Sequence, residues 1–241
     1  MLEIKKKMLL SAAEGICRRD LIGMFVNKDG NVECVYDEVK SVSPNAFTAV
    51  SNRFKEILEF HTFEGATILD PTCGYGLWWK AIDRTRYNIT LSDKYDFGQN
   101  IISDFRNLDM YKSFDMVVFD PPYMFGCIKS DDPLKDVYQG YSQSYDELIG
   151  YARGANINFS KLLKENGKLI YKCSDQYNVL ERKFYPHHIT IVNEMSNFEL
   201  IDIVLFIYHR VSPTAYQVKN RPSSIINYTY FLIFKVREKE A

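Results

Sequence analysis

The strongest constraint on the fold is a change of hydrophobic period near residue 66. From there, short apolar runs of strand length alternate with segments of helical pattern. The expected strands cover residues 67–70, 87–91, 114–119 and 168–172, with helices near 77–84 and 144–165. Such alternation predicts an α/β fold, a mostly parallel sheet with helices on both faces. Two final runs, 199–208 and 228–236, lack an intervening helix and predict a closing pair with one antiparallel strand.

The chain before this region is expected to form an N-terminal appendage, residues 1–42. Residues 2–17 have the pattern of a short amphipathic helix, and 24–35 that of a hairpin with Asp29-Gly30 at its turn. Ser43-Pro44 suits the start of a helix, because Ser caps free N–H groups and Pro is tolerated at the first helical position. We therefore assign residues 43–241 to one catalytic domain.

Charge, cysteine content and hydropathy limit the classes of function. The formal net charge is −1, so nucleic acid would have to bind to a local basic patch. Five scattered cysteines form no Cys-x-x-Cys pair, which predicts neither disulfides nor a metal site. No signal-peptide pattern and no apolar run of membrane-spanning length occurs. We expect a soluble, cytoplasmic protein without a membrane partner.

A glycine-rich turn follows the first expected strand of the sheet. Gly74 and Gly76 can adopt positive φ and let a ligand approach the backbone closely. In open α/β sheets, ligands bind beyond the carboxyl ends of the strands, where this turn must lie. Trp79 occupies the place of the third glycine in the dinucleotide fingerprint, which disfavours a pyrophosphate.

Acidic residues follow the next two apolar runs. Asp93 stands 19 residues after Gly74, near the position where an acid accepts hydrogen bonds from ribose hydroxyls. Asp104 is followed by Phe105, and an acid beside an aromatic ring suits an adenine ring with its amine. The implied cofactor contains adenosine but no pyrophosphate.

The segment Asp120-Pro-Pro-Tyr123 directly follows a buried strand. Pro121 and Pro122 stiffen the backbone and leave their carbonyls without competing N–H groups. Asp120 and the Pro121 carbonyl can accept both hydrogens of a base amine, whose nitrogen lone pair then points toward a methyl donor. Tyr123 can stack on a flipped base. This set predicts methylation of an exocyclic amine, with positioning as the main catalytic effect.

These two segments resemble the amino-methyltransferases with a DPPY motif, best known as DNA adenine methyltransferases. Asp70-Pro-Thr-Cys-Gly-Tyr-Gly76 is similar to their cofactor motif, and Asp120-Pro-Pro-Tyr123 matches their catalytic motif. The resemblance implies a Rossmann-like methyltransferase fold and S-adenosylmethionine as cofactor. It also implies N6 of adenine in DNA as the target, since cytosine-specific members more often carry Ser in place of Asp120. By this resemblance, the cofactor site includes Asp70, Pro71, Thr72, Cys73, Gly74 and Gly76.

The resemblance extends to two further segments. Ser43-Pro-Asn-Ala46 is similar in place to the family's contact with the methionine end of the cofactor. Lys172-Cys-Ser-Asp-Gln176 is similar to relatives of phage and archaeal type, without an assigned role. No target-recognition domain is evident, because loops 124–143 and 209–227 are short. A protein partner or a homodimer could supply target recognition.

Three alternatives remain open from the sequence. The first is an RNA amino-methyltransferase acting on adenine or guanine, although we favour DNA. The second is a nucleic-acid-binding, non-catalytic subunit of a methyltransferase complex, which would not need Asp120 and Tyr123. The third is a methyltransferase for small molecules or protein glutamine, where Asn-Pro-Pro-Tyr is the commoner form.

Two adjacent pairs of residues are given structural roles. Trp78 and Trp79 are expected to pack a helix on the sheet. His187 and His188 are adjacent, so on a helix they point about 100° apart and cannot share a metal. We expect both at the surface.

Overall fold

The computed structural model forms two compact units, Met1–Asn45 and Ala46–Ala241. It describes residues 19–26, 32–38, 46–125, 144–178, 181–207, 226 and 228–238. In the first unit, β1 (Arg19–Val26) pairs antiparallel with β2 (Val32–Glu38), which confirms the expected hairpin. The expected helix over 2–17, the Asp29-Gly30 turn and the Ser43-Pro44 cap lie outside the described residues.

The second unit contains a seven-stranded sheet in the order β10-β11-β7-β6-β3-β4-β5. Its strands are β3 (Thr67–Asp70), β4 (Asn88–Asp93), β5 (Ile101–Ile102), β6 (Phe114–Phe119), β7 (Leu163–Cys173), β10 (Phe198–Ile207) and β11 (Tyr228–Val236). Neighbours from β7 to β5 pair in parallel, whereas β11 runs antiparallel to both β7 and β10. The mixed sheet with one antiparallel strand is confirmed.

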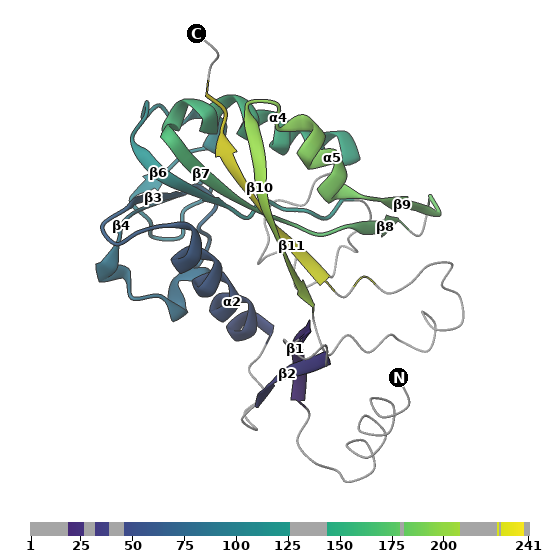
Figure 1. The fold of residues 1–241 in the computed structure, drawn as a ribbon. Coiled ribbons are helices and arrows are strands. Elements are labelled where there is room, and N and C mark those ends of the chain that lie inside the picture. The colour runs from purple at the N-terminus through teal and green to yellow at the C-terminus, as the bar shows by residue number, and fades with distance from the viewer. Residues whose placement is uncertain are drawn as a thin grey trace. The chain divides into compact units, whose positions relative to one another are not determined.

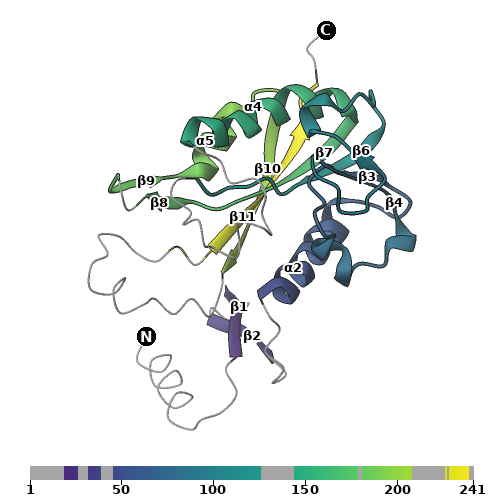
Figure 2. The same ribbon diagram turned by 180° about the vertical axis from the view of Figure 1, so that it is seen from behind.

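Helices cover both faces of this sheet (Figures 1 and 2). The helix α2 (Ala46–His61) lies on one face, and α4 (Tyr145–Leu162) and α5 (His187–Glu194) lie on the other. Successive strand residues point to opposite faces, so two apolar cores form. Ile68 and Met116 pack in the core that contains Phe54 of α2, while Leu69 and Val117 pack in the core that contains Phe159 of α4.

The prediction of a helix near residues 77–84 is wrong. The chain forms two short 3₁₀ helices there, η1 (Leu77–Ala81) and η2 (Arg84–Arg86). Gly76 precedes η1 in the left-handed conformation at φ 66°, and the extended residue Ile82 follows the end of η1. Asp83 is also extended, and its side chain accepts a hydrogen bond from the Thr85 amide. These local side-chain and glycine preferences compete with a continuous helix.

The α4 helix begins where the sequence places it but ends earlier. Ser144 caps it by accepting a hydrogen bond from the Glu147 amide, and α4 ends at Leu162. Residues 163–165, expected in the helix, belong to β7. The structure adds α5 and a small antiparallel pair, β8 (Gln176–Asn178) with β9 (Lys183–Tyr185), which the hydrophobic pattern does not reveal.

Candidate active site

Three acidic residues lie where neighbouring parallel strands end. Asp70 ends β3, Asp93 ends β4, and Asp120 directly follows β6. Because these strands run in the same direction, their carboxyl ends share one edge of the sheet. The three carboxylates interact electrostatically, since the charges on Asp93 and Asp120 both raise the pKa of Asp70.

Asp70 is buried beneath the glycine-rich turn. Its Oδ2 accepts a hydrogen bond from Trp79 Nε1 at 2.7 Å, and its Oδ1 accepts one from the Thr72 amide at 3.1 Å. Burial raises the pKa of Asp70 to about 7, although both hydrogen bonds favour the charged form. A cation near this carboxylate would favour its ionised state.

The glycine-rich turn is held open beside Asp93. Gly74 and Gly76 adopt φ values of 48° and 66°, in the left-handed region that favours glycine. Asp93 Oδ2 accepts a hydrogen bond from the Gly74 amide at 2.9 Å, and Oδ1 accepts one from the Tyr95 amide at 3.0 Å. A Cβ placed on Gly74 would meet no atom within 4 Å, so open space adjoins the backbone.

Asp120 is joined to this turn and to β7. Its amide donates to Thr72 Oγ1 at 2.9 Å. Lys172 Nζ lies 2.9 and 3.1 Å from the two carboxylate oxygens of Asp120, and only 8% of the Lys172 side chain is exposed. Burial raises the pKa of Asp120, whereas Lys172 and a hydrogen bond from the Trp78 side chain oppose that rise.

The Pro-Pro-Tyr part of the segment extends from a buried to an open position. Pro121 is buried, and Pro122 and Tyr123 are partly exposed. The Lys172 ammonium lies over the Tyr123 ring, 5.1 Å from its centroid, and over the Trp78 ring at 5.3 Å. Tyr123 and Trp78 therefore flank the Asp120–Lys172 ion pair.

Asp104 and Phe105 follow β5 at the same edge. Asp104 forms a two-point ion pair with Arg106, with contacts of 2.8 and 2.6 Å, and Arg106 lowers the pKa of Asp104. The Phe105 ring is buried against Phe119 and Phe159. Any contact of Phe105 with a ligand would therefore involve its main chain or ring edge.

The two sequence segments thus meet, and the structure adds residues that sequence reasoning missed. Lys172 lies in the segment Lys172–Gln176, for which the family resemblance gave no role. Its signal was a charged residue inside the buried apolar run from Leu169 to Cys173 at the end of β7. Trp78 and Trp79 pack on Phe54 as expected, but both also contact an acid of the site.

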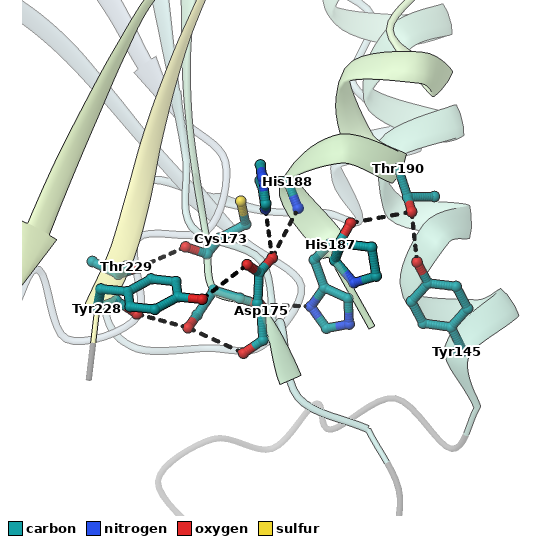
Figure 3. Close-up of polar contacts among 10 residues, drawn as sticks. Tyr145, Cys173, Asp175, His187, His188, Thr190, Tyr228 and Thr229 are labelled. Carbon is teal, nitrogen blue, oxygen red and sulfur yellow. Dashed lines mark hydrogen bonds and ion pairs between the residues drawn. The ribbon is translucent and has the colours of Figure 1, made fainter. Parts of the chain in front are cut away.

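The prediction that His187 lies at the surface is wrong, because the residue is fully buried. Figure 3 shows its ring beside the end of β7, where Nδ1 donates to the Ser174 carbonyl at 2.6 Å. Burial lowers the pKa of His187 to about 4. The adjacent Asp175 carboxylate accepts hydrogen bonds from His188 Nδ1 at 2.7 Å and from the Tyr228 hydroxyl at 3.2 Å. The Ser174 carbonyl, one residue after β7, thus satisfies Nδ1 of the buried ring, whereas Nε2 has no hydrogen-bond partner among the described residues.

Solved structures show which fold this is. The N-methyltransferase NodS from Bradyrhizobium japonicum WM9, in complex with S-adenosyl-L-homocysteine, aligns with a TM-score of 0.50 and 14% identity, over 81% of this chain and 90% of that chain. TrmN from Thermus thermophilus aligns with a TM-score of 0.50 and 10% identity, over 86% of this chain and 57% of that chain. No family model matches the sequence, and no curated protein is significantly similar to it. The fold is the Rossmann-like methyltransferase fold.

Two further features concern the described part of the chain alone. Its helices include none that is long and apolar enough to cross a membrane. Its His, Cys, Asp and Glu residues form no group of three or more suited to a metal ion.

Proposed function

We propose that this chain is an S-adenosylmethionine-dependent methyltransferase that methylates the N6 amine of adenine in DNA. The observation that carries the proposal is the joining of the two motif segments at one sheet edge. The Asp120 amide bonds to Thr72 of the glycine-rich turn, so a cofactor held by the turn would lie beside the Asp120 carboxylate.

The residues at this edge fit the proposed cofactor. S-adenosylmethionine carries a sulfonium and an ammonium cation, and it supplies an electrophilic methyl group when bound. Asp70 and Asp93 provide negative charge that suits such a ligand better than a pyrophosphate. The open space at Gly74 gives the adenosine access to the backbone, and Asp93 can still accept hydrogen bonds from ribose hydroxyls. Asp104 and Phe105 would border the adenine.

The Asp120-Pro-Pro-Tyr123 segment supplies the acceptors that a base amine needs. The Asp120 carboxylate and the Pro121 carbonyl accept the two amine hydrogens, which directs the nitrogen lone pair away from the base ring. With Lys172 over one face of Tyr123, the opposite face is the one offered to the base. A flipped adenine stacked there gains about 1–3 kcal/mol.

The test is transfer of tritium from methyl-labelled S-adenosylmethionine onto matched pools of DNA, RNA, free nucleosides and protein. We expect label in DNA, and in digested nucleosides we expect it at N6-methyladenine. Label confined to RNA would show that the substrate is RNA and not DNA, and that the methyl-transfer chemistry is as proposed. Label confined to nucleosides or protein would contradict a nucleic-acid substrate, and no label in any pool would contradict the enzyme class.

A further inference from the structure

The segment Lys172–Gln176 contacts the Asp120–Phe125 segment at both of its ends. β7 pairs in parallel with β6, with Tyr171 opposite Phe119. The next residues, Lys172 and Asp120, are therefore neighbours where the two strands diverge. Lys172 binds the beginning of the Asp120–Phe125 segment through both oxygens of the Asp120 carboxylate.

Gln176 binds the other end of the Asp120–Phe125 segment. Its Oε1 accepts a hydrogen bond from the Phe125 amide at 3.1 Å, and its Nε2 donates to the Phe125 carbonyl at 2.8 Å. One carboxamide therefore satisfies both main-chain groups of Phe125. The Phe125 ring is buried and packs against Tyr185 and Tyr145, with centroids 4.9 and 5.4 Å away.

Ser174 and Asp175, which lie between Lys172 and Gln176, form hydrogen bonds of their own. Asp175 bonds to His188 on α5 and to Tyr228 on β11, and Ser174 Oγ donates to the Tyr228 carbonyl at 2.9 Å (Figure 3). The Ser174 carbonyl also accepts from His187. The segment that holds Asp120 and Phe125 is thus fixed to elements outside the site, which gives it the rigidity that a supporting residue needs.

We propose that Lys172 and Gln176 are positioning residues that hold the Asp120–Phe125 segment at its two ends, so that the Asp120 carboxylate stays ionised and aimed at the base amine. This role rests on the proposed methyl transfer. Lys172 acts on the charge and orientation of Asp120, and Gln176 acts on the path of the backbone that carries Tyr123.

The charge relation has a defined sign. Among the described residues, the ionisable groups that interact with Asp120 are Lys172, Asp70, Tyr171 and Cys173, and Lys172 is the cation of this set. Replacing Lys172 by a neutral residue removes the attraction that favours the anion, so the pKa of Asp120 rises further. Activity that requires the carboxylate is then lost at a higher pH than in the wild type.

The experiment compares Lys172→Met and Lys172→Arg with a control, Lys168→Met, across pH 5.5 to 9. Lys168 lies four residues earlier on β7 and bonds to the His61 carbonyl, away from Asp120. For Lys172→Met we expect kcat at pH 6, relative to kcat at pH 8.5, to fall below the wild-type ratio, because the raised pKa of Asp120 leaves less carboxylate at the lower pH. Lys172→Arg should restore the ratio, and Lys168→Met should not change it. An equal loss for Lys172→Met at every pH would overturn the assignment.

Two measurements keep the test independent of activity and of folding defects. NMR titration of the Asp120 carboxyl carbon should give a higher pKa in Lys172→Met than in the wild type, whether or not any nucleic acid is methylated; an unchanged pKa overturns the role of Lys172. Gln176→Leu should lower kcat about tenfold while the Kd for S-adenosylhomocysteine stays the same, because the cofactor turn is untouched. If it weakens cofactor binding and kcat alike, Gln176 is merely structural. A wild-type protein that transfers no methyl group refutes the proposed function, but the titration still decides the Lys172–Asp120 coupling.

Discussion

Asp120 and Asp70 end adjacent strands, yet their charges are balanced in different ways. Asp120 faces a buried ammonium, whereas Asp70 is surrounded by neutral N–H donors from Trp79 and Thr72. Neutral donors compensate a buried charge less completely than a counter-ion does. Burial raises the pKa of both carboxyls, to about 7 for Asp70, and Lys172 opposes the rise at Asp120.

The backbone at Gly74 gives the first prediction at the residue scale. Gly74→Ala places a Cβ in the left-handed region, at a stability cost of about 1–2 kcal/mol, and fills the space assigned to the cofactor. We expect calorimetry to show at least tenfold weaker binding of S-adenosylhomocysteine. Gly65→Ala is the matched control, since Gly65 also has positive φ and open space but lies before β3, at the opposite edge. Equal binding losses in both variants would argue against a cofactor at Gly74.

Tyr123 gives the second prediction at this scale. Stacking needs an aromatic face and no hydroxyl, so Tyr123→Phe should keep most of the activity. Tyr123→Ala should lose about 1–3 kcal/mol of base binding, seen as a fall of about five- to hundredfold in kcat/KM. If Phe proved as damaging as Ala in steady-state kinetics, the hydroxyl would be the working group and stacking would be refuted.

At the scale of elements, the sequence predicted strands better than connections. Strands 67–70 and 114–119 match β3 and β6 residue for residue, because buried parallel strands are continuous apolar runs between polar boundaries. The segment after Gly76 has helical periodicity but forms 3₁₀ turns, since the left-handed glycine and the Asp83 cap act locally. Periodicity averages over a window and does not register such local competitors.

The same limit applies to the candidate site. The glycine-rich turn and the Asp120–Tyr123 segment are contiguous in sequence and could be predicted. The Asp120–Lys172 pair joins residues 52 apart, and it depends on the register between β6 and β7. The burial of His187 likewise depends on α5 packing against α4, where its ring stacks on that of Tyr145, and no local pattern encodes this packing.

The His187 side chain gives a prediction about the junction of β7 and α5. Its pKa of about 4 in the folded state lies below the ordinary 6.5, so the unfolded chain binds more protons between those values. This contribution to stability is complete above about pH 6.5 and is lost as the pH falls toward 4. Chemical denaturation should show that the wild type loses about 2 kcal/mol more than His187→Phe between pH 6.5 and 5. Parallel pH profiles for the two proteins would show that His187 does not titrate in this way.

At the scale of the whole molecule, we propose that residues 43–241 form the catalytic domain, since the seven-stranded sheet and the helices on its two faces belong to this range. A chain starting at Ser43 should unfold cooperatively with heat. With S-adenosylhomocysteine at 100 times its Kd, it should gain about 2.7 kcal/mol of stability. A fragment without a cooperative transition would show that residues 1–42 are needed for folding.

The net charge of −1 gives no general attraction to a polyanion, so the proposed recognition of DNA depends on local chemistry at one edge of the sheet. We propose that Asp120 accepts hydrogens from a base amine and does not bind the cofactor. Asp120→Ala alone would leave the Lys172 ammonium buried without a counter-ion, which is strongly destabilising. The double variant Asp120→Ala/Lys172→Met removes both charges and preserves the fold for comparison.

The most direct measurement is mass spectrometry of nucleosides from DNA incubated with S-adenosylmethionine and either the wild type, Asp120→Ala or the double variant. We expect N6-methyladenine with the wild type alone. We also expect the double variant to bind S-adenosylhomocysteine within a few-fold of wild-type affinity. Undiminished N6-methyladenine with either variant would contradict the role of Asp120, as would loss of cofactor binding in a folded double variant.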